Sequence, residues 1–163
     1  MTKKYVFISG NVSGFYRTQS LIKSLSDLDY EVVKVPHFFQ SSLTIKFLSK
    51  VIKFLEFIFI FPLRMYLLFK SDFVLVTAMN MKLANLFDII IGRLFKKRVI
   101  VDFYFSRYEA EAIDRKRIDK NTFSAALLKF TDRLIHDLAS KVIFLNYSEK
   151  HYYQGILKAN KNQ

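Results

Sequence analysis

The chain has 163 residues and a formal net charge of +12, and apolar residues make up 52% of it. This size and composition suit one compact domain with its own core, and they exclude an intrinsically disordered chain. Cysteine is absent and the three histidines lack ligand spacing, so neither a disulfide scaffold nor a metal site is expected. The excess of Lys and Arg favours a partner with negative charge.

Short apolar runs alternate with helical patterns along the chain. A strand is predicted at 5–9, a helix at 16–28 and a second strand at 32–35. The remaining strands are predicted at 73–77, 99–102 and 142–145, and the remaining helices at 43–69, 83–94, 123–138 and 147–157. Nearly all strand residues are apolar, which is typical of a parallel sheet covered on both faces. The pattern predicts an α/β fold with a Rossmann-like parallel sheet in one domain at 1–157, followed by a polar tail at 158–163.

The helix predicted at 123–138 has an apolar stripe and a candidate start signal. Asn121 is the expected N-cap. The stripe consists of Phe123, Leu127, Phe130, Leu134 and Leu138. His136 lies in the same helix without a visible partner, so a structural or solvated role is expected for it rather than a catalytic one.

Ligands of such sheets bind beyond the carboxyl ends of the strands. Gly10 and Gly14 follow the first strand, where they let backbone N–H groups approach a phosphate or a sugar, or form only a tight turn. Their spacing is not that of a dinucleotide-binding loop, and no acidic residue follows the second strand. Asp102 ends the fourth strand, where its carboxylate can act as a base, orient a hydroxyl or cap a loop.

The segment at 43–69 is both hydrophobic and basic. Its internal charges argue against a membrane span, which wants about 20 mostly apolar residues. Its lysines fall within about 60° of one another on a helix, which favours an interfacial helix on anionic head groups. The alternative is a helix packed on the sheet with solvated lysines, and Pro62 is expected to break or kink the segment into two helices. The expected membrane-contact residues are Lys46, Lys50, Lys53, Phe54, Phe57, Phe61 and Arg64.

The distribution of charge along the chain indicates the class of partner, and the first residues indicate the cellular location. The positive charge is spread evenly over the two halves of the chain, and no nucleic-acid-binding signature is present, so a nucleic-acid partner is not expected. The first residues lack the pattern of a signal peptide. We therefore expect a cytoplasmic protein, peripheral on the inner face of the cell membrane.

Several motifs in the second half of the chain resemble one enzyme family. They are Asp102-Phe103-x2-Ser106-x-Tyr108-Glu109, Asp114-Arg115-Lys116, Thr131-Asp132-Arg133-Leu134, Ala139-Ser140-Lys141-Val142-Ile143-Phe144-Leu145 and His151-Tyr152-Tyr153. Together with the opening strand, glycine loop and helix, they resemble the N-terminal half of bacterial glycosyltransferase family 4, which has the GT-B fold. The resemblance covers about residues 4–157.

The resemblance implies an acceptor-binding domain that faces a second Rossmann-like domain across the active site. It implies sugar transfer from a nucleotide-sugar to an acceptor, here a lipid-linked saccharide of cell-surface polysaccharide synthesis, without a metal and without a cofactor bound by this chain. Asp102 takes the position of the family's reacting-sugar residue, as base or orienting carboxylate. The expected acceptor-binding residues are Gly10, Asn11, Gly14, Arg17, Tyr104, Ser106, Arg107 and Tyr108.

The donor-binding half of the family is not visible in this sequence. That half carries a Glu-x7-Glu pattern, and no two glutamates here are so spaced. We therefore expect a glycosyltransferase fragment or subunit that is inactive without a donor-binding domain or partner chain. The alternatives are a non-catalytic membrane-surface adaptor with a Rossmann-like core and a flavodoxin-like nucleotide-binding protein.

Overall fold

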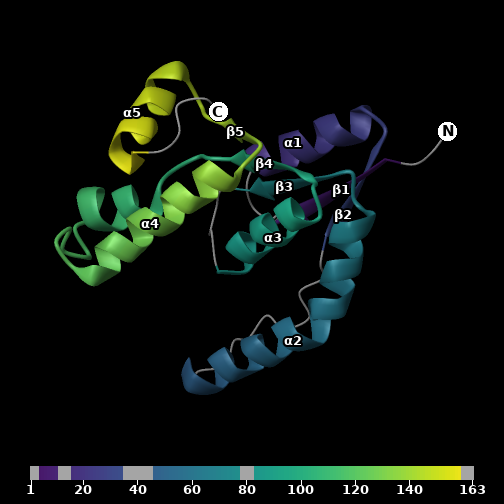
Figure 1. Ribbon diagram of the computed structural model, residues 1–163, viewed down its shortest axis with the longest axis horizontal. Helices are drawn as coiled ribbons and strands as arrows, with labels where there is room; N and C mark the ends of the chain where they lie inside the picture. Colours follow the sequence, from purple (N-terminus) through teal and green to yellow (C-terminus); the bar gives the residue numbers. More distant parts are fainter. Residues whose placement is uncertain (1–3, 11–15, 35–45, 78–82, 159–163) are drawn as a thin grey trace.

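The computed structural model describes residues 4–10, 16–34, 46–77 and 83–158, without the side chains of 46–57 and 83–84 (Figure 1). The strands are β1 (Lys4–Ser9), β2 (Tyr30–Lys34), β3 (Phe73–Thr77), β4 (Arg98–Asp102) and β5 (Lys141–Ile143). The helices are α1 (Tyr16–Asp27), α2 (Lys46–Lys70), α3 (Leu83–Leu94), α4 (Phe123–Leu138), α5 (Tyr147–Leu157) and a short π-helix, η1 (Glu109–Asp114).

The five strands form one parallel sheet in the order β2-β1-β3-β4-β5. This confirms the predicted α/β fold with a Rossmann-like sheet flanked by helices. The strand order reverses at β1, because β2 lies on one side of it and β3 on the other. In doubly wound sheets the ligand crevice opens at such a switch point, beyond the carboxyl ends of the strands.

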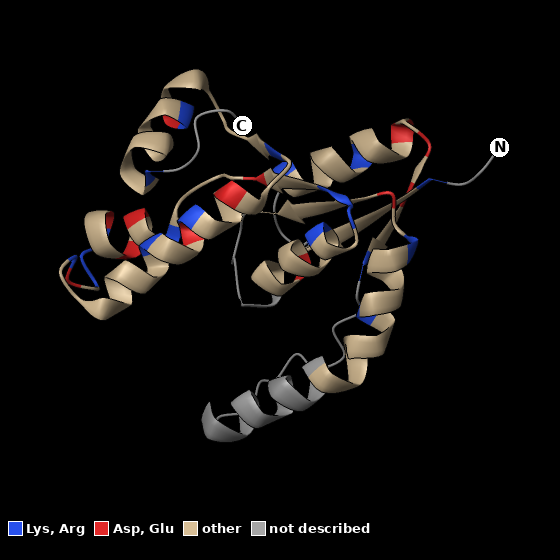
Figure 2. Ribbon diagram, viewed as in Figure 1, with Lys and Arg blue, Asp and Glu red and all other residues tan. Residues whose placement is uncertain are grey.

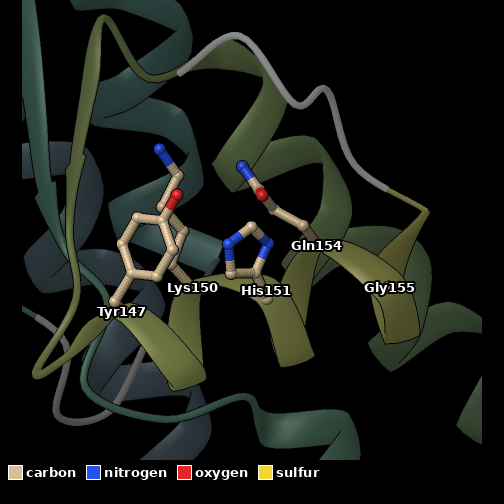
Figure 3. Close-up of a pocket in the computed structure, with 5 residues that line it drawn as sticks. All are labelled: Tyr147, Lys150, His151, Gln154 and Gly155. Carbon is tan, nitrogen blue, oxygen red and sulfur yellow. The ribbon is translucent and has the colours of Figure 1, made fainter.

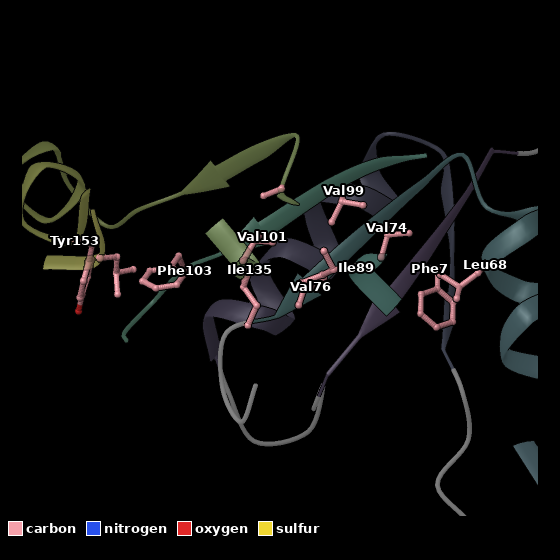
Figure 4. Close-up of a cluster of buried hydrophobic side chains, with 12 residues drawn as sticks. Phe7, Leu68, Val74, Val76, Ile89, Val99, Val101, Phe103, Ile135 and Tyr153 are labelled. Atoms are coloured by element: carbon pink, nitrogen blue, oxygen red, sulfur yellow. The ribbon is translucent and has the colours of Figure 1, made fainter. Parts of the chain in front are cut away.

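The two faces of the sheet bury different residues, because side chains alternate along a strand. On one face, Phe7 of β1 packs in a cluster that also takes Leu68 of α2 and Ile89 of α3 (Figure 4). On the other face, Val6 and Ile8 pack against apolar residues of α1. The apolar runs thus become strands buried on both sides, as their composition predicts.

α4 differs from its prediction at its start and in the face that it buries. Its N-cap is Thr122, whose Oγ1 accepts a hydrogen bond from the Ala125 N–H at 3.3 Å, and not Asn121. The first part of the predicted apolar stripe, including Phe123 and Phe130, is exposed. The buried positions are Ala125, Asp132, Ile135 and His136. The difference arises because α4 buries two polar residues, which a search for apolar spacing does not select.

α2 is one helix that contains Pro62, and Figure 1 shows that it bends. The predicted break into two helices is therefore wrong, whereas a bend is what proline causes when it removes a backbone hydrogen bond. Among the described ranges, none of the helices combines the length and the apolar character that crossing a bilayer requires.

Candidate functional site at the carboxyl edge of the sheet

Gly10 begins the candidate site, directly after β1. Its φ is +118°, a region that favours glycine. A Cβ at this position would lie 2.4 Å from Thr77 Oγ1 and 3.0 Å from the Thr77 carbonyl oxygen. β1 and β3 therefore approach closely at the switch point, and this approach requires glycine. Asn11 and Gly14, which were predicted to bind the acceptor, lie outside the described residues.

Arg17 of α1 and Asp102 of β4 form an ion pair at the same edge. Arg17 Nε donates to the two carboxylate oxygens of Asp102 at 2.9 and 3.0 Å, and Nη2 donates to Oδ1 at 2.6 Å. The Asp102 side chain is 2% exposed, whereas that of Arg17 is 31% exposed. The hydrogen bond with Asp102 raises the pKa of Arg17, so the guanidinium stays a cation in a fixed orientation.

Tyr104 completes this group at the surface. Its ring centroid lies 5.9 Å from the guanidinium carbon of Arg17, and the side chain is partly exposed. In the part of the chain that the structure describes, Nη1 of Arg17 has no hydrogen-bond partner. The edge thus presents an oriented cation beside an aromatic ring, with N–H groups that no described residue engages, which suits an anionic group joined to an apolar or sugar-like body.

The pairing bears on the two roles expected for Asp102. Both carboxylate oxygens already accept hydrogen bonds from Arg17. The geometry therefore favours Asp102 as the residue that orients Arg17 over Asp102 as a general base.

Ser106 and Asp132, which belong to two separate motifs of the resemblance, meet in the interior. Ser106 Oγ donates to Asp132 Oδ2 at 2.6 Å and accepts from the Glu109 N–H at 3.1 Å. Ser106 is fully buried, so it fastens the segment after β4 to α4, which corrects the expectation that it contacts an acceptor. Burial raises the pKa of Asp132, and the hydrogen bond from Ser106 opposes that effect.

Tyr108 and Arg107 follow in the same segment. The Tyr108 backbone N–H donates to Asp132 Oδ2 at 2.9 Å, and Lys129 Nζ lies 5.4 Å from the centroid of the Tyr108 ring. Arg107 is exposed. The structure thus brings Arg17 and Tyr104 together beside Asp102, and the predicted acceptor role of Arg107 stays a prediction.

A buried polar cluster of Ser9, Asn85, Asp88 and Arg64 lies next to Gly10. Arg64 Nε and Nη2 donate to the two carboxylate oxygens of Asp88, and Ser9 Oγ donates to Oδ2. Asn85 Nδ2 donates to Ser9 Oγ at 2.9 Å. Burial raises the pKa of Asp88, while Arg64 and Ser9 lower it.

This cluster corrects one sequence prediction and reveals residues that the prediction missed. Arg64 was expected to face a membrane, but it is 9% exposed and points to Asp88, where its charge is compensated. The sequence held one signal for this pairing, which is the lone acid Asp88 within the apolar pattern at 83–94. A buried carboxylate needs a cationic partner.

The outer face of α2 is apolar over the part of the helix whose side chains the structure describes. Phe59, Tyr66 and Phe69 are all more than half exposed, and Figure 2 shows few charges on the described part of this helix. Phe61, which was predicted to contact a membrane, lies 5.5 Å from the Phe87 ring centroid to centroid and keeps 36% exposure. The side chains of Lys46, Lys50, Lys53, Phe54 and Phe57 lie outside the described set.

A concave surface lies on α5. It is a hollow of about 300 Å³, and Figure 3 shows the side chains that line it, which are Tyr147, Lys150, His151, Gln154 and Gly155. The rings of Tyr147 and His151 meet edge to face at 4.5 Å. None of the described residues that were predicted to bind an acceptor lines this hollow.

Within the described ranges, no group of three or more His, Asp or Glu side chains is placed to hold a metal ion. No family profile, no curated protein and no solved structure matches the chain.

Proposed function

We propose that this chain is the acceptor-binding half of a glycosyltransferase. In this proposal it holds a lipid-linked saccharide at the carboxyl edge of the sheet, and a donor-binding domain or partner chain supplies the nucleotide-sugar. The observation that carries the proposal is the Arg17–Asp102 pair beside Tyr104. The resemblance to glycosyltransferase family 4 supports the reaction class.

The chemistry of the pair matches one part of such an acceptor. A lipid-linked saccharide joins its sugar to the lipid through phosphate groups, and the planar fork of arginine binds phosphate oxygens with two parallel hydrogen bonds. Asp102 holds the inner N–H groups of Arg17, so the outer Nη1 edge is presented to a ligand. Tyr104 offers a ring against which the apolar face of a sugar can pack.

A membrane-bound acceptor also requires the protein to approach the lipid surface. The exposed aromatic residues Phe59, Tyr66 and Phe69 of α2 suit the interfacial layer, in which amphipathic rings are stable. Lys46, Lys50 and Lys53 precede them on the same helix and suit anionic head groups. We therefore place α2 at the membrane in this proposal, with Arg64 excluded from the contact.

The alternative is a membrane-surface adaptor without a saccharide ligand, which the outer face of α2 favours equally. A single titration distinguishes the two. Geranyl-pyrophosphoryl glucose and geranyl-pyrophosphoryl N-acetylglucosamine are added to the isotope-labelled chain, with inorganic pyrophosphate and free glucose as controls, and the amide resonances of residues 10 and 17 are followed by NMR. The proposal predicts saturable shifts with at least one of the conjugates at lower concentration than with either control. An adaptor predicts binding to anionic vesicles and no preference for the conjugates.

A further inference from the structure

The cluster of Ser9, Asn85, Asp88 and Arg64 joins three elements at one point. Ser9 ends β1, Arg64 belongs to α2, and Asn85 and Asp88 lie three residues apart on α3. All four residues are at least nine-tenths buried. Within the described residues, Ser9 Oγ makes one hydrogen bond as a donor, to Asp88, and one as an acceptor, from Asn85.

The same cluster reaches the backbone of the candidate site. Thr77 Oγ1 donates to the Ser9 carbonyl oxygen at 3.3 Å, so both the side chain and the backbone of Ser9 are held. Gly10 follows directly, and a Cβ on it would lie 3.3 Å from Asn85 Nδ2. The direction in which the chain leaves β1 is therefore set by polar contacts on Ser9 and by close packing on Gly10.

Stability alone does not account for a charged pair at this position. Removing two charges from water costs so much that well-packed apolar residues of similar volume are often as stabilising as a buried ion pair. What apolar residues cannot do is accept the hydrogen bond of the Ser9 hydroxyl. The Arg64 guanidinium holds both Asp88 oxygens in place, and one of these oxygens receives Ser9.

We propose that Arg64 and Asp88 are positioning residues of the acceptor site: through Ser9 they fix the backbone at Gly10, and so preorganise the edge at which Arg17 binds the acceptor. The proposal rests on the proposed function for its ligand, but the fixed backbone at Gly10 can be observed without one. It also gives α2 a second role, because the helix with the exposed aromatic face supplies the cation of the cluster.

Two variants test the proposal, one at Ser9 and one at the Arg64–Asp88 pair. Ser9→Ala removes the link and leaves the ion pair intact. Arg64→Met with Asp88→Leu removes both charges together and leaves no uncompensated charge in the core. The matched control is Arg115→Met with Glu111→Leu, which makes the same chemical change at a pair joined at 3.3 Å on the exposed side of η1.

The first readout is the amide resonance of Gly10 in the ligand-free chain, with the thermal unfolding midpoint measured alongside. The second is the affinity for geranyl-pyrophosphoryl glucose. We expect the Gly10 resonance to move in both test variants and to stay in place in the control. Affinity falls about three- to tenfold for Ser9→Ala, which loses the hydrogen bond to Asp88 and the one from Asn85. It falls further for the double variant, while the unfolding midpoint of that variant stays close to that of the unaltered chain.

Unchanged affinity in Ser9→Ala, or an unchanged Gly10 resonance in the double variant, would overturn the proposal. The affinity of Ser9→Ala decides the matter if the double variant does not fold. Failure of the proposed function looks different. If the unaltered chain binds no conjugate, the acceptor assignment is wrong, and the Gly10 resonance still decides whether the cluster positions this backbone. If Arg17→Met abolishes binding while Ser9→Ala and the double variant bind normally, the acceptor site stands and the positioning role is wrong.

Discussion

The guanidinium of Arg17 contacts both carboxylate oxygens of Asp102, although 85 positions separate the two residues in the chain. Arg17 lies in the first turn of α1, directly after β1, and Asp102 ends β4. Because β3 lies between these strands in the sheet, the pair crosses the carboxyl edge next to the switch point. This position makes the pair a candidate ligand contact as well as a tie between α1 and the sheet.

Asp102→Asn should weaken acceptor binding without unfolding the chain. Asparagine keeps the shape of the side chain but loses its charge and one acceptor oxygen, so Arg17 is held less firmly. Charge-assisted hydrogen bonds contribute about 1.5–3 kcal/mol each. The hydrogen bonds from Arg17 to Asp102 hold the guanidinium in its orientation, and the variant loses part of this energy. We expect a clear loss of affinity for geranyl-pyrophosphoryl glucose with an unchanged circular dichroism spectrum, and loss of sugar transfer once the donor-binding half is supplied. Full transfer activity in this variant would remove Asp102 from the mechanism.

Gly10→Ala should destabilise the fold, whereas Gly155→Ala should not. The positive φ of Gly10 and the contact of an added Cβ with Thr77 impose strain of about 1–3 kcal/mol. Gly155 lies inside α5 with open space around its position, so alanine there should add about 0.5–1 kcal/mol of stability. Urea unfolding of both variants measures the two effects. Equal stabilities would show that the close approach of β1 and β3 is not rigid.

His136 should make the fold sensitive to acid. It is fully buried against Phe103 and Phe144, and neither ring nitrogen has a hydrogen-bond partner in the described structure. Burial lowers its pKa below the ordinary value of 6.5. Below pH 6.5 the unfolded chain therefore binds a proton that the folded chain does not, and stability falls as the pH falls towards the lowered pKa.

One proton gives a slope of at most about 1.4 kcal/mol per pH unit. His136→Phe removes the titrating group and keeps a ring among the aromatic neighbours, so the variant should lose this slope. Unfolding free energies of both proteins from pH 7 down to pH 5 provide the measurement. The same pH dependence in the variant would assign the acid sensitivity to other groups.

Changing Lys46, Lys50 and Lys53 together to Glu should release the chain from anionic vesicles. Each lysine near such a surface contributes about 1 kcal/mol of attraction, and charge reversal adds repulsion. The control variant carries the same charge change at Lys23, Lys120 and Lys141, which are exposed on other parts of the chain. Co-sedimentation with vesicles that contain phosphatidylglycerol measures binding. Equal sedimentation of the two variants would show that the lysines of α2 are not the contact.

Much of the fold is predictable from the sequence because it follows from apolar periodicity. The strand at 73–77 and the helices at 83–94, 123–138 and 147–157 have the predicted bounds. The π-helix η1 escaped prediction, because its sequence is short and charged and its backbone is held by distant partners such as the Ser106–Asp132 pair. Local pattern carries no information about such partners.

The candidate site was predictable only in part. The sheet edge, Gly10, Arg17 and Asp102 follow from topology, because residues after parallel strands share one edge. That Arg17 pairs with Asp102, or that Arg64 turns inward to Asp88, depends on tertiary packing. On a straight helix Arg64 falls on the face of Lys46, Lys50 and Lys53, and the pattern alone does not reveal that a buried acid on α3 compensates its charge.

The most direct test of the acceptor site is a calorimetric titration of geranyl-pyrophosphoryl glucose and geranyl-pyrophosphoryl N-acetylglucosamine into the chain, its Arg17→Met variant and its Arg133→Met variant. Arg133 pairs with Asp137 on the exposed side of α4 and serves as the matched control. The account predicts saturable binding of at least one conjugate by the unaltered chain and the control, and at least a tenfold weaker binding by Arg17→Met, the equivalent of about 1.4 kcal/mol. Equal affinities in all three proteins would contradict the assignment of Arg17 to the acceptor.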